Sequence, residues 1–162
     1  MVIRKASAED MRACSPLVAE FRDALRSLKG LAPKRDLSAA EEEWMEHCGP
    51  GFAAYIALVE SRCAGFLVCR IDAPTVWVES VYVLPEYRRK GVASALYEEA
   101  ERLAQSYGED TLYNYVHPNN DAMIAFLRTR GYHVLNMIEI RKKHEWEDPR
   151  AKVQVGSHLF DY

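Results

Sequence analysis

The sequence predicts a mixed α/β chain folded around one central sheet. Its 162 residues are the size of one ordinary domain, and 49% hydrophobic with 28% charged residues is the composition of a globular protein. Three runs of strand character lie within residues 53–83, and helical spacing and then another strand follow them. A strand–helix–strand order of this kind implies a right-handed parallel crossover within one sheet.

The first elements are a short strand and a long helix. Residues 1–5 have strand character, and the segment from Ser7 to Asp10 resembles a capping box that starts a helix. Apolar side chains then recur at helical spacing as far as Leu28. We expect Pro16 to kink or break this helix and Gly30 to end it.

The middle of the chain predicts a second helix and three strands. A second capping box, Ser38 to Glu41, opens a short acidic helix that ends at Gly49. The strands cover residues 53–60, 63–71 and 75–83, and a tight turn joins the first two into a hairpin. Both faces of the third strand are largely apolar, which is typical of a strand inside a sheet.

The rest of the chain alternates between the two periods. The expected elements are a helix over 89–107, a strand over 111–116, a helix from Asn120 to Gly131, and strands over 132–141 and 152–160. The order is therefore β-α-α-β-β-β-α-β-α-β-β, with about four helices and a mixed sheet of about six or seven strands. We expect one domain over 1–162, with its core in 3–144 and a C-terminal strand over 152–160.

Composition and charge exclude several classes of function. The net charge of −3 and pI of about 6.0 argue against nucleic-acid binding, which usually needs a basic excess. The longest apolar run, residues 52–59, is far shorter than the roughly 20 residues of a membrane span, and the N-terminus lacks a signal-peptide pattern. We therefore expect a cytoplasmic protein without membrane partners.

Cysteine and histidine spacing does not indicate a metal site. The four cysteines contain no C-x-x-C pair, and the histidines lack the close spacing that zinc ligands show. We interpret the cysteines as small apolar residues and expect no metal cofactor. They are Cys14, Cys48, Cys63 and Cys69.

The segment from Val81 to Leu96 carries the strongest chemical signal. A strand ends, a tight turn follows, and a helix begins just after Gly91. Backbone N–H groups at such a helix start are free to bind anions, and glycine lets a ligand approach the backbone closely. Arg88, Arg89 and Lys90 add positive charge. The alternative is a solvated charge run beside an ordinary helix-start glycine, but the combination is typical of a pyrophosphate site.

This segment is neither a Walker loop nor a dinucleotide fingerprint, because both glycine patterns are absent. It resembles the acetyl-CoA motif of the Gcn5-related N-acetyltransferase (GNAT) family, approximately Val-x-x-x-x-[Arg/Gln]-x-x-Gly-x-[Gly/Ala]. Val83, Arg88, Gly91 and Ala93 stand in that register. A second family motif, an Asn before a helix that ends in Gly-aromatic, is matched by four residues: Asn120, Phe126, Gly131 and Tyr132. The similar element order extends from Ile3 to about Arg141.

The resemblance implies a GNAT-like acyl-CoA N-acyltransferase fold with acetyl-CoA as co-substrate. The pantetheine arm would lie where the strand ending at Val83 splays from the strand starting at Thr111, and a backbone N–H near Val81 or Tyr82 would polarise the acetyl carbonyl. The implied cofactor-binding residues are Val81, Tyr82, Val83, Arg88, Arg89, Lys90, Gly91, Val92, Ala93, Ser94, Asn120 and Phe126.

Glu79 is the candidate catalytic residue. It is the lone ionisable side chain in an otherwise apolar strand, four residues before Val83. In the family a Glu at the matching place often serves as general base, and a partly buried carboxylate has a raised pKa that suits this task. The alternative is a carboxylate at the sheet edge that faces water or pairs with an arginine.

The sequence departs from the family pattern at Leu127. Many members have a Tyr there that protonates the departing CoA thiolate, so no general acid is assigned. Glu41, Glu42 and Glu43 either border the acceptor cleft or form a solvated helix face.

Three hypotheses follow: acetyl transfer from acetyl-CoA to a primary amine in a ternary complex, a non-catalytic acyl-CoA-binding module with the same fold, and an enzyme for longer acyl-CoAs. The amine acceptor is not identified by the sequence, and a homodimer is a further expectation from the family.

Overall fold

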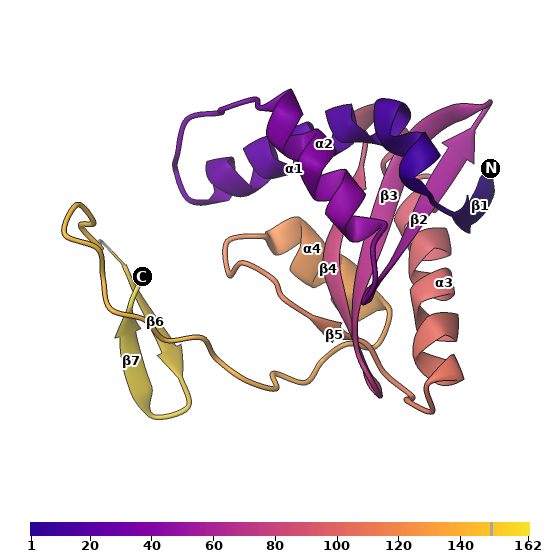
Figure 1. Ribbon diagram of the computed structural model, residues 1–162. Coiled ribbons are helices and arrows are strands. Elements are labelled where there is room, and N and C mark those ends of the chain that lie inside the picture. The colour runs from indigo at the N-terminus through magenta and orange to yellow at the C-terminus, as the bar shows by residue number, and fades with distance from the viewer. Residues whose placement is uncertain (150) are drawn as a thin grey trace. The chain divides into compact units, whose positions relative to one another are not determined.

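The computed structural model describes residues 1–149 and 151–162, which form two compact units, Met1–Phe126 and Leu127–Tyr162. The first unit holds a five-stranded sheet and the second a two-stranded sheet. In the first unit, α1 and α2 cover one face of the sheet and α3 covers the other (Figure 1). The mixed α/β class predicted from periodicity is confirmed.

The large sheet has the order β1-β2-β3-β4-β5. Neighbouring strands are antiparallel from β1 to β4, and β5 is parallel to β4, as the crossover through α3 requires. The strands are β1 (Val2–Lys5), β2 (Phe52–Val59), β3 (Arg62–Asp72), β4 (Thr75–Val83) and β5 (Tyr113–Asn114).

The sheet is smaller than the expected six or seven strands. Residues 132–141 form no strand, although their sequence favours one, because strand propensity becomes a strand only where a neighbour completes the hydrogen-bond ladder. Residues 152–160, expected as one strand, form the hairpin of β6 (Lys152–Val155) and β7 (His158–Asp161). Gly156, with φ of 59°, and Ser157 make its two-residue turn.

Helix α1 (Met11–Leu28) follows a 3-10 turn, η1 (Ala8–Asp10), and continues through Pro16. Of the two outcomes expected at Pro16, a kink or a break, the break is therefore wrong, because one missing N–H near the start of an 18-residue helix leaves enough packing to hold it. The helix ends as predicted at Gly30, whose φ is 68°, with the paired hydrogen bonds of a Schellman motif.

Helix α2 (Leu37–His47) begins one residue before the predicted capping box. Its cap is Asp36, whose carboxylate accepts the Ala39 N–H at 3.0 Å. An aspartate satisfies the free N–H and also complements the positive end of the helix dipole, so it displaces Ser38 as the cap.

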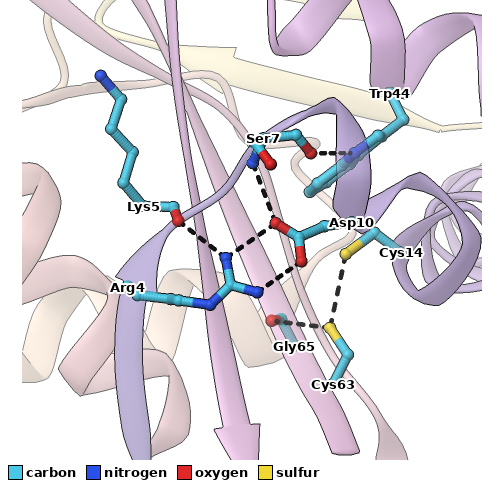
Figure 2. Close-up of polar contacts among 8 residues, drawn as sticks. All are labelled: Arg4, Lys5, Ser7, Asp10, Cys14, Trp44, Cys63 and Gly65. Carbon is cyan, nitrogen blue, oxygen red and sulfur yellow. Dashed lines mark hydrogen bonds and ion pairs between the residues drawn. The ribbon is translucent and has the colours of Figure 1, made fainter.

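The junction between β1 and α1 is fixed by polar contacts (Figure 2). The Asp10 carboxylate accepts a hydrogen bond from the Ser7 N–H at 3.0 Å, which is one of the two bonds of the predicted capping box. It also accepts a hydrogen bond from Arg4 at 2.9 Å. Behind it, the fully buried Trp44 donates its indole N–H to the Ser7 carbonyl at 3.2 Å and packs edge-on against Phe66. These contacts anchor α1 and α2 on the sheet.

Helix α3 (Val92–Ser106) packs Leu96, Tyr97 and Ala100 against the opposite face of the sheet, where all three are fully buried. A 3-10 turn, η2 (Pro85–Tyr87), links β4 to this helix, and α4 (Asp121–Thr129) follows β5. In the described ranges, no helix combines the length and apolarity that a membrane crossing needs.

Candidate active site

Glu79 lies in a β-bulge of β4. Val78 and Ser80 pair with consecutive residues of β3, Cys69 and Val68, so Glu79 between them has no partner. A bulge inserts one extra residue and re-aims side chains, which is how an ionisable residue can sit in an otherwise apolar strand without being buried. The Glu79 side chain is exposed, and its Oε2 lies 3.4 Å from Nε of Arg70.

The Arg70 contact matches the alternative weighed for Glu79, a carboxylate paired with an arginine. It does not remove the carboxylate from solvent or occupy both of its oxygens. Glu79 is therefore still placed to accept a proton from a ligand, and its catalytic role stays a prediction.

Strands β4 and β5 separate soon after they meet. Their parallel ladder holds only two residue pairs, Trp77 with Tyr113 and Val78 with Asn114. Beyond Val78, β4 runs on to Val83, and none of the strands described pairs with it on that side. The predicted divergence of these strands is present, and it leaves backbone groups of β4 able to pair with an extended ligand.

A cradle of backbone N–H groups, residues 89–94, lies where β4 leads into α3. Ala95 is the first residue of the helix whose N–H has a backbone acceptor, the Gly91 carbonyl at 3.0 Å. Within the described residues, the N–H groups from Arg89 to Ser94 have no backbone acceptor. Arg89 and Gly91 both have positive φ, 60° and 81°, so this backbone is sharply curved in the manner of an anion-binding nest.

The space above the cradle is open. A Cβ added to Gly91 would meet no atom within 4 Å, so the backbone there has open space beside it. Arg89 and Lys90 are exposed beside it, and the Lys90 ammonium lies 5.8 Å from the centre of the Tyr87 ring. Val92 is buried, so only its backbone can face a ligand.

Arg88 connects the cradle to the strand. Its Nε donates to the Val83 carbonyl at 2.9 Å, and its guanidinium lies 5.4 Å from the centre of the Tyr82 ring. The Tyr82 hydroxyl donates to Glu20 at 3.1 Å, and burial followed by the nearby Glu20 carboxylate raises the pKa of that hydroxyl. The motif arginine thus holds the turn in shape and lies beside the Tyr82 ring.

Two residues of the second motif, Asn120 and Phe126, have capping and packing roles. Asn120 caps α4, with its side-chain oxygen accepting the Met123 N–H at 3.1 Å. The Phe126 ring packs edge-on against Tyr97 at 5.0 Å. Both predicted positions at the start and along the face of α4 are therefore found, and their contact with a cofactor stays a prediction.

Leu127 is buried, 7% exposed, as suits an apolar side chain in a helix. In the acidic helix α2, Glu43 pairs with Arg22 through an oxygen 2.7 Å from its Nε. Nearby His47 is buried with no hydrogen-bond partner for its Nδ1 among the described residues, and burial lowers its pKa. Within those residues, no group of three or more His, Cys, Asp or Glu is arranged to hold a metal ion.

A row of aromatic side chains near Glu79, formed by Trp77, Tyr113 and Tyr115, was not predicted from the sequence. Trp77 stacks on Tyr115 with ring centres 4.8 Å apart and contacts Tyr113 at 4.9 Å, while the Arg70 guanidinium lies 5.7 Å from the Trp77 ring centre. The alternation of Tyr113 and Tyr115 was a signal that these two share a face. Nothing local indicated that β4 and β5 would bring them onto Trp77.

These observations describe a strand end, a divergent edge and an anion cradle in the arrangement expected of an acyl-CoA site. The sequence profile described as the acetyltransferase (GNAT) family matches residues 17–132. The chain belongs to the GNAT family. Its members are acyltransferases, and the predicted family is thus confirmed over most of the chain.

Individual relatives agree with this assignment. The chain is 31% identical over 72 residues to an aminoglycoside N(6')-acetyltransferase type 1 from Acinetobacter genomosp. 13. That alignment covers 44% of this chain, and it spans about half of the relative, 49%.

Solved structures share the GNAT fold at lower identity. The aminoglycoside N-acetyltransferase AAC(6')-Iy, in complex with a bisubstrate analogue, matches with a TM-score of 0.66 and 20% identity over 88% of this chain and 97% of that one. A ribosomal-protein-alanine N-acetyltransferase from Brucella melitensis biovar Abortus 2308 matches with a TM-score of 0.70 and 18% identity, over 88% and 100%. These likenesses establish the fold.

Proposed function

We propose that this GNAT protein transfers the acetyl group of acetyl-CoA to a primary amine by direct attack in a ternary complex. The observation that carries the proposal is the cradle of residues 89–94, with free N–H groups and an open Gly91, placed directly after the strand edge that diverges from β5. A pyrophosphate fits the cradle, and an extended pantetheine arm fits the strand edge.

The reaction needs little from the protein beyond positioning and proton transfer. The amine nitrogen attacks the thioester carbon, the C–S bond breaks, and the electron pair leaves with the CoA sulfur. Glu79 takes the proton that the ammonium loses before attack, and a backbone N–H near Val81 or Tyr82 stabilises the developing oxyanion. The second proton, which the nitrogen loses as the amide forms, passes to water or to the departing CoA thiolate. A free thiol has a pKa of about 8.5, so the thiolate can leave without an acid at the Leu127 position.

The acceptor is proposed to be a cationic amine. The relatives that act on aminoglycosides, and the acidic net charge of −3, support this class. The ribosomal-protein-alanine N-acetyltransferase among the structural matches has the same fold and, by its name, a protein acceptor. Protein amines are therefore included in the panel of acceptors described below.

The second candidate function is a non-catalytic acyl-CoA-binding module. The buried Leu127, at a position where many family members have a tyrosine acid, is the observation that favours it. A preference for a longer acyl chain is a third outcome. CoA affinity separates none of these, whereas detectable turnover and acyl-chain preference do.

The decisive experiment is a panel of amines assayed by release of free thiol from acetyl-CoA. The panel contains a peptide N-terminus, a lysine peptide, a polyamine, an amino acid and an aminoglycoside. We expect turnover with at least one amine. CoA binding by calorimetry without turnover on any amine would support the binding module, and a faster reaction with butyryl-CoA would support the longer acyl chain.

Two further expectations belong to the whole protein. We propose a homodimer, which light scattering on the purified chain would test, and a cytoplasmic location, which fractionation of the source cells would test.

A further inference from the structure

The aromatic row, Trp77 with Tyr113 and Tyr115, is more than a cross-strand pair. Tyr113 is the ladder partner of Trp77, so the sheet register explains that contact. Tyr115 lies beyond the last residue of β5, yet its ring stacks on Trp77 at 4.8 Å and an interplanar angle of 10°. The ladder does not require this third ring.

The row is open to solvent. Tyr115 is 56% exposed, and Trp77 and Tyr113 are half-buried. In contrast, the core aromatics Trp44 and Tyr97 are fully buried, and both have hydrogen-bond partners for their polar atoms. An exposed, stacked aromatic surface that the core does not need is suited to bind the flat face of a ring.

The charges beside the row favour a cation. Arg70 lies 5.7 Å from the Trp77 ring centre, 2.6 Å from Asp72 and 3.4 Å from Glu79, so one guanidinium serves two carboxylates. Together, Arg70, Asp72 and Glu79 have a formal net charge of −1, and aromatic faces also attract cations. Arg70 contacts both the candidate base and the row, which places an acceptor site next to the proposed proton transfer.

We propose that the aromatic row binds the acceptor, and that the acceptor is a primary ammonium carried on a ring with an apolar face. The ring stacks on the exposed outer face of Tyr115, which Trp77 supports from behind, and the ammonium points toward Glu79. This inference rests on the proposed acetyl transfer and adds the shape of the amine. A linear amine has no face to stack, so it gains nothing from the row.

The test compares ring-bearing and linear amines in variants of Tyr115. Tyr115→Ser removes the ring, Tyr115→Phe keeps it, and Tyr107→Ser changes another exposed tyrosine as a control. The acceptors are 2-phenylethylamine, 6-amino-6-deoxyglucose and pentylamine. Thermal melting checks that each variant is folded.

We expect Tyr115→Ser to lower kcat/KM by about fivefold to tenfold for ring amines, chiefly through KM, the size of one aromatic stacking contact. Pentylamine should change less than twofold. Tyr115→Phe, which keeps the ring, should retain most of the ring-amine activity that Tyr115→Ser loses, and Tyr107→Ser should behave as the unmodified protein. A larger loss with phenylethylamine would identify an arylalkylamine acceptor, and a larger loss with the aminosugar would identify an amino sugar. An equal loss for pentylamine, or no loss for either ring amine, would overturn the inference.

A binding measurement separates this inference from the proposed function. The same amines are titrated into the protein saturated with CoA, and the affinity is measured by calorimetry. If no amine is acetylated but ring amines bind in a manner that Tyr115→Ser weakens, the acetyltransferase proposal fails and the ring site stands. If acetylation occurs without any dependence on Tyr115, the reverse holds.

Discussion

Glu79 shows how one unpaired residue can change the chemistry of a strand. Its neighbours Val78 and Ser80 are buried, whereas Glu79 is exposed because the bulge gives it no partner on β3. A regular ladder at this point would force the carboxylate into one of two packed faces, and burial of a charge without compensation is costly.

Glu79→Gln tests the proposed general base. The amide keeps the shape of the side chain but cannot accept a proton, so we expect kcat to fall by about 10²–10⁴ at neutral pH while CoA affinity barely changes. The loss should shrink at high pH, where more of the amine is already neutral. A full pH–rate profile, with CoA calorimetry as the control, measures both effects. A profile unaltered by the substitution would assign the proton to another group or to solvent.

Two of the four thiols, those of Cys14 and Cys63, form a close pair. Sγ of Cys14 lies 3.7 Å from Sγ of Cys63, and Cys63 is also 3.7 Å from the Gly65 carbonyl (Figure 2). The contact between the thiols lowers the pKa of Cys63 and, together with burial, raises that of Cys14. Burial raises the pKa of Cys69 to about 12 and also raises that of Cys48.

The contact between these two thiols predicts which cysteine reacts first with an alkylating reagent. The thiolate is the reactive form of cysteine, so the lowered pKa should make Cys63 the first thiol to react with iodoacetamide near pH 7.5. A time course of peptide mass spectrometry measures the order. Cys14→Ala removes the neighbouring S–H and should slow Cys63, whereas Cys14→Ser keeps a donor and should not. First labelling at Cys14, Cys48 or Cys69 would contradict the assignment.

The start of α3 is the element on which the proposed cofactor site depends. Its geometry is local: two residues with positive φ, Arg89 and Gly91, turn the chain so that successive N–H groups face outward. Arg88 fixes the same turn to the end of β4 through the Val83 carbonyl. The site therefore combines a helix terminus with the strand that precedes it.

Substitutions at Gly91 separate backbone strain from loss of the anion site. Gly91→Ala adds a Cβ that meets no atom but forces a side chain to adopt φ of 81°, at a cost of about 1 kcal/mol in stability. Gly91→Glu has the same strain and also places a carboxylate in the cradle. We expect the Glu variant to lose CoA binding by calorimetry while the Ala variant weakens it about tenfold or less. Unchanged CoA affinity in a folded Gly91→Glu protein would remove the cradle assignment.

At the scale of the whole molecule, the two compact units differ in how much they bury. Met1–Phe126 holds nearly all of the buried apolar side chains, whereas the segment 133–149 has no helix or strand and exposes most of its side chains. Val134 and Leu135 are 90% and 70% exposed. Segments with few buried contacts have the lowest local stability.

Limited proteolysis should therefore begin in this segment. We expect trypsin to cut first at Arg141, Lys142 or Lys143, which are all exposed, and to leave the unit Met1–Phe126 intact for longer. Mass spectrometry of early time points identifies the cuts. A parallel digest with CoA tests whether CoA binding protects the cradle, residues 89–94, from cleavage after Arg89. A first cut at the equally exposed Lys34 or Arg35, in the loop before α2, would contradict this ranking.

Short-range chemistry accounts for what the sequence alone determined. The helix ends at Gly30, Gly108 and Gly131 and the helix start at Asn120 depend on contacts within a few residues, so local patterns predicted them correctly. The turn at Gly91 is equally local, and its role in binding a cofactor stays a prediction. The hairpin turn at Gly156 is also local, and the expectation of one strand over 152–160 missed it.

Long-range pairing decided the rest. The bulge at Glu79 comes from the register of β4 against β3, and the contacts of Glu79 and Trp77 with Arg70 need both strands in place. Residues 132–141 have a strand pattern without a ladder, and Tyr115 reaches Trp77 only because β5 returns beside β4. Periodicity states which residues share a face, but register and partner are set between distant segments, so only the tertiary structure fixes them.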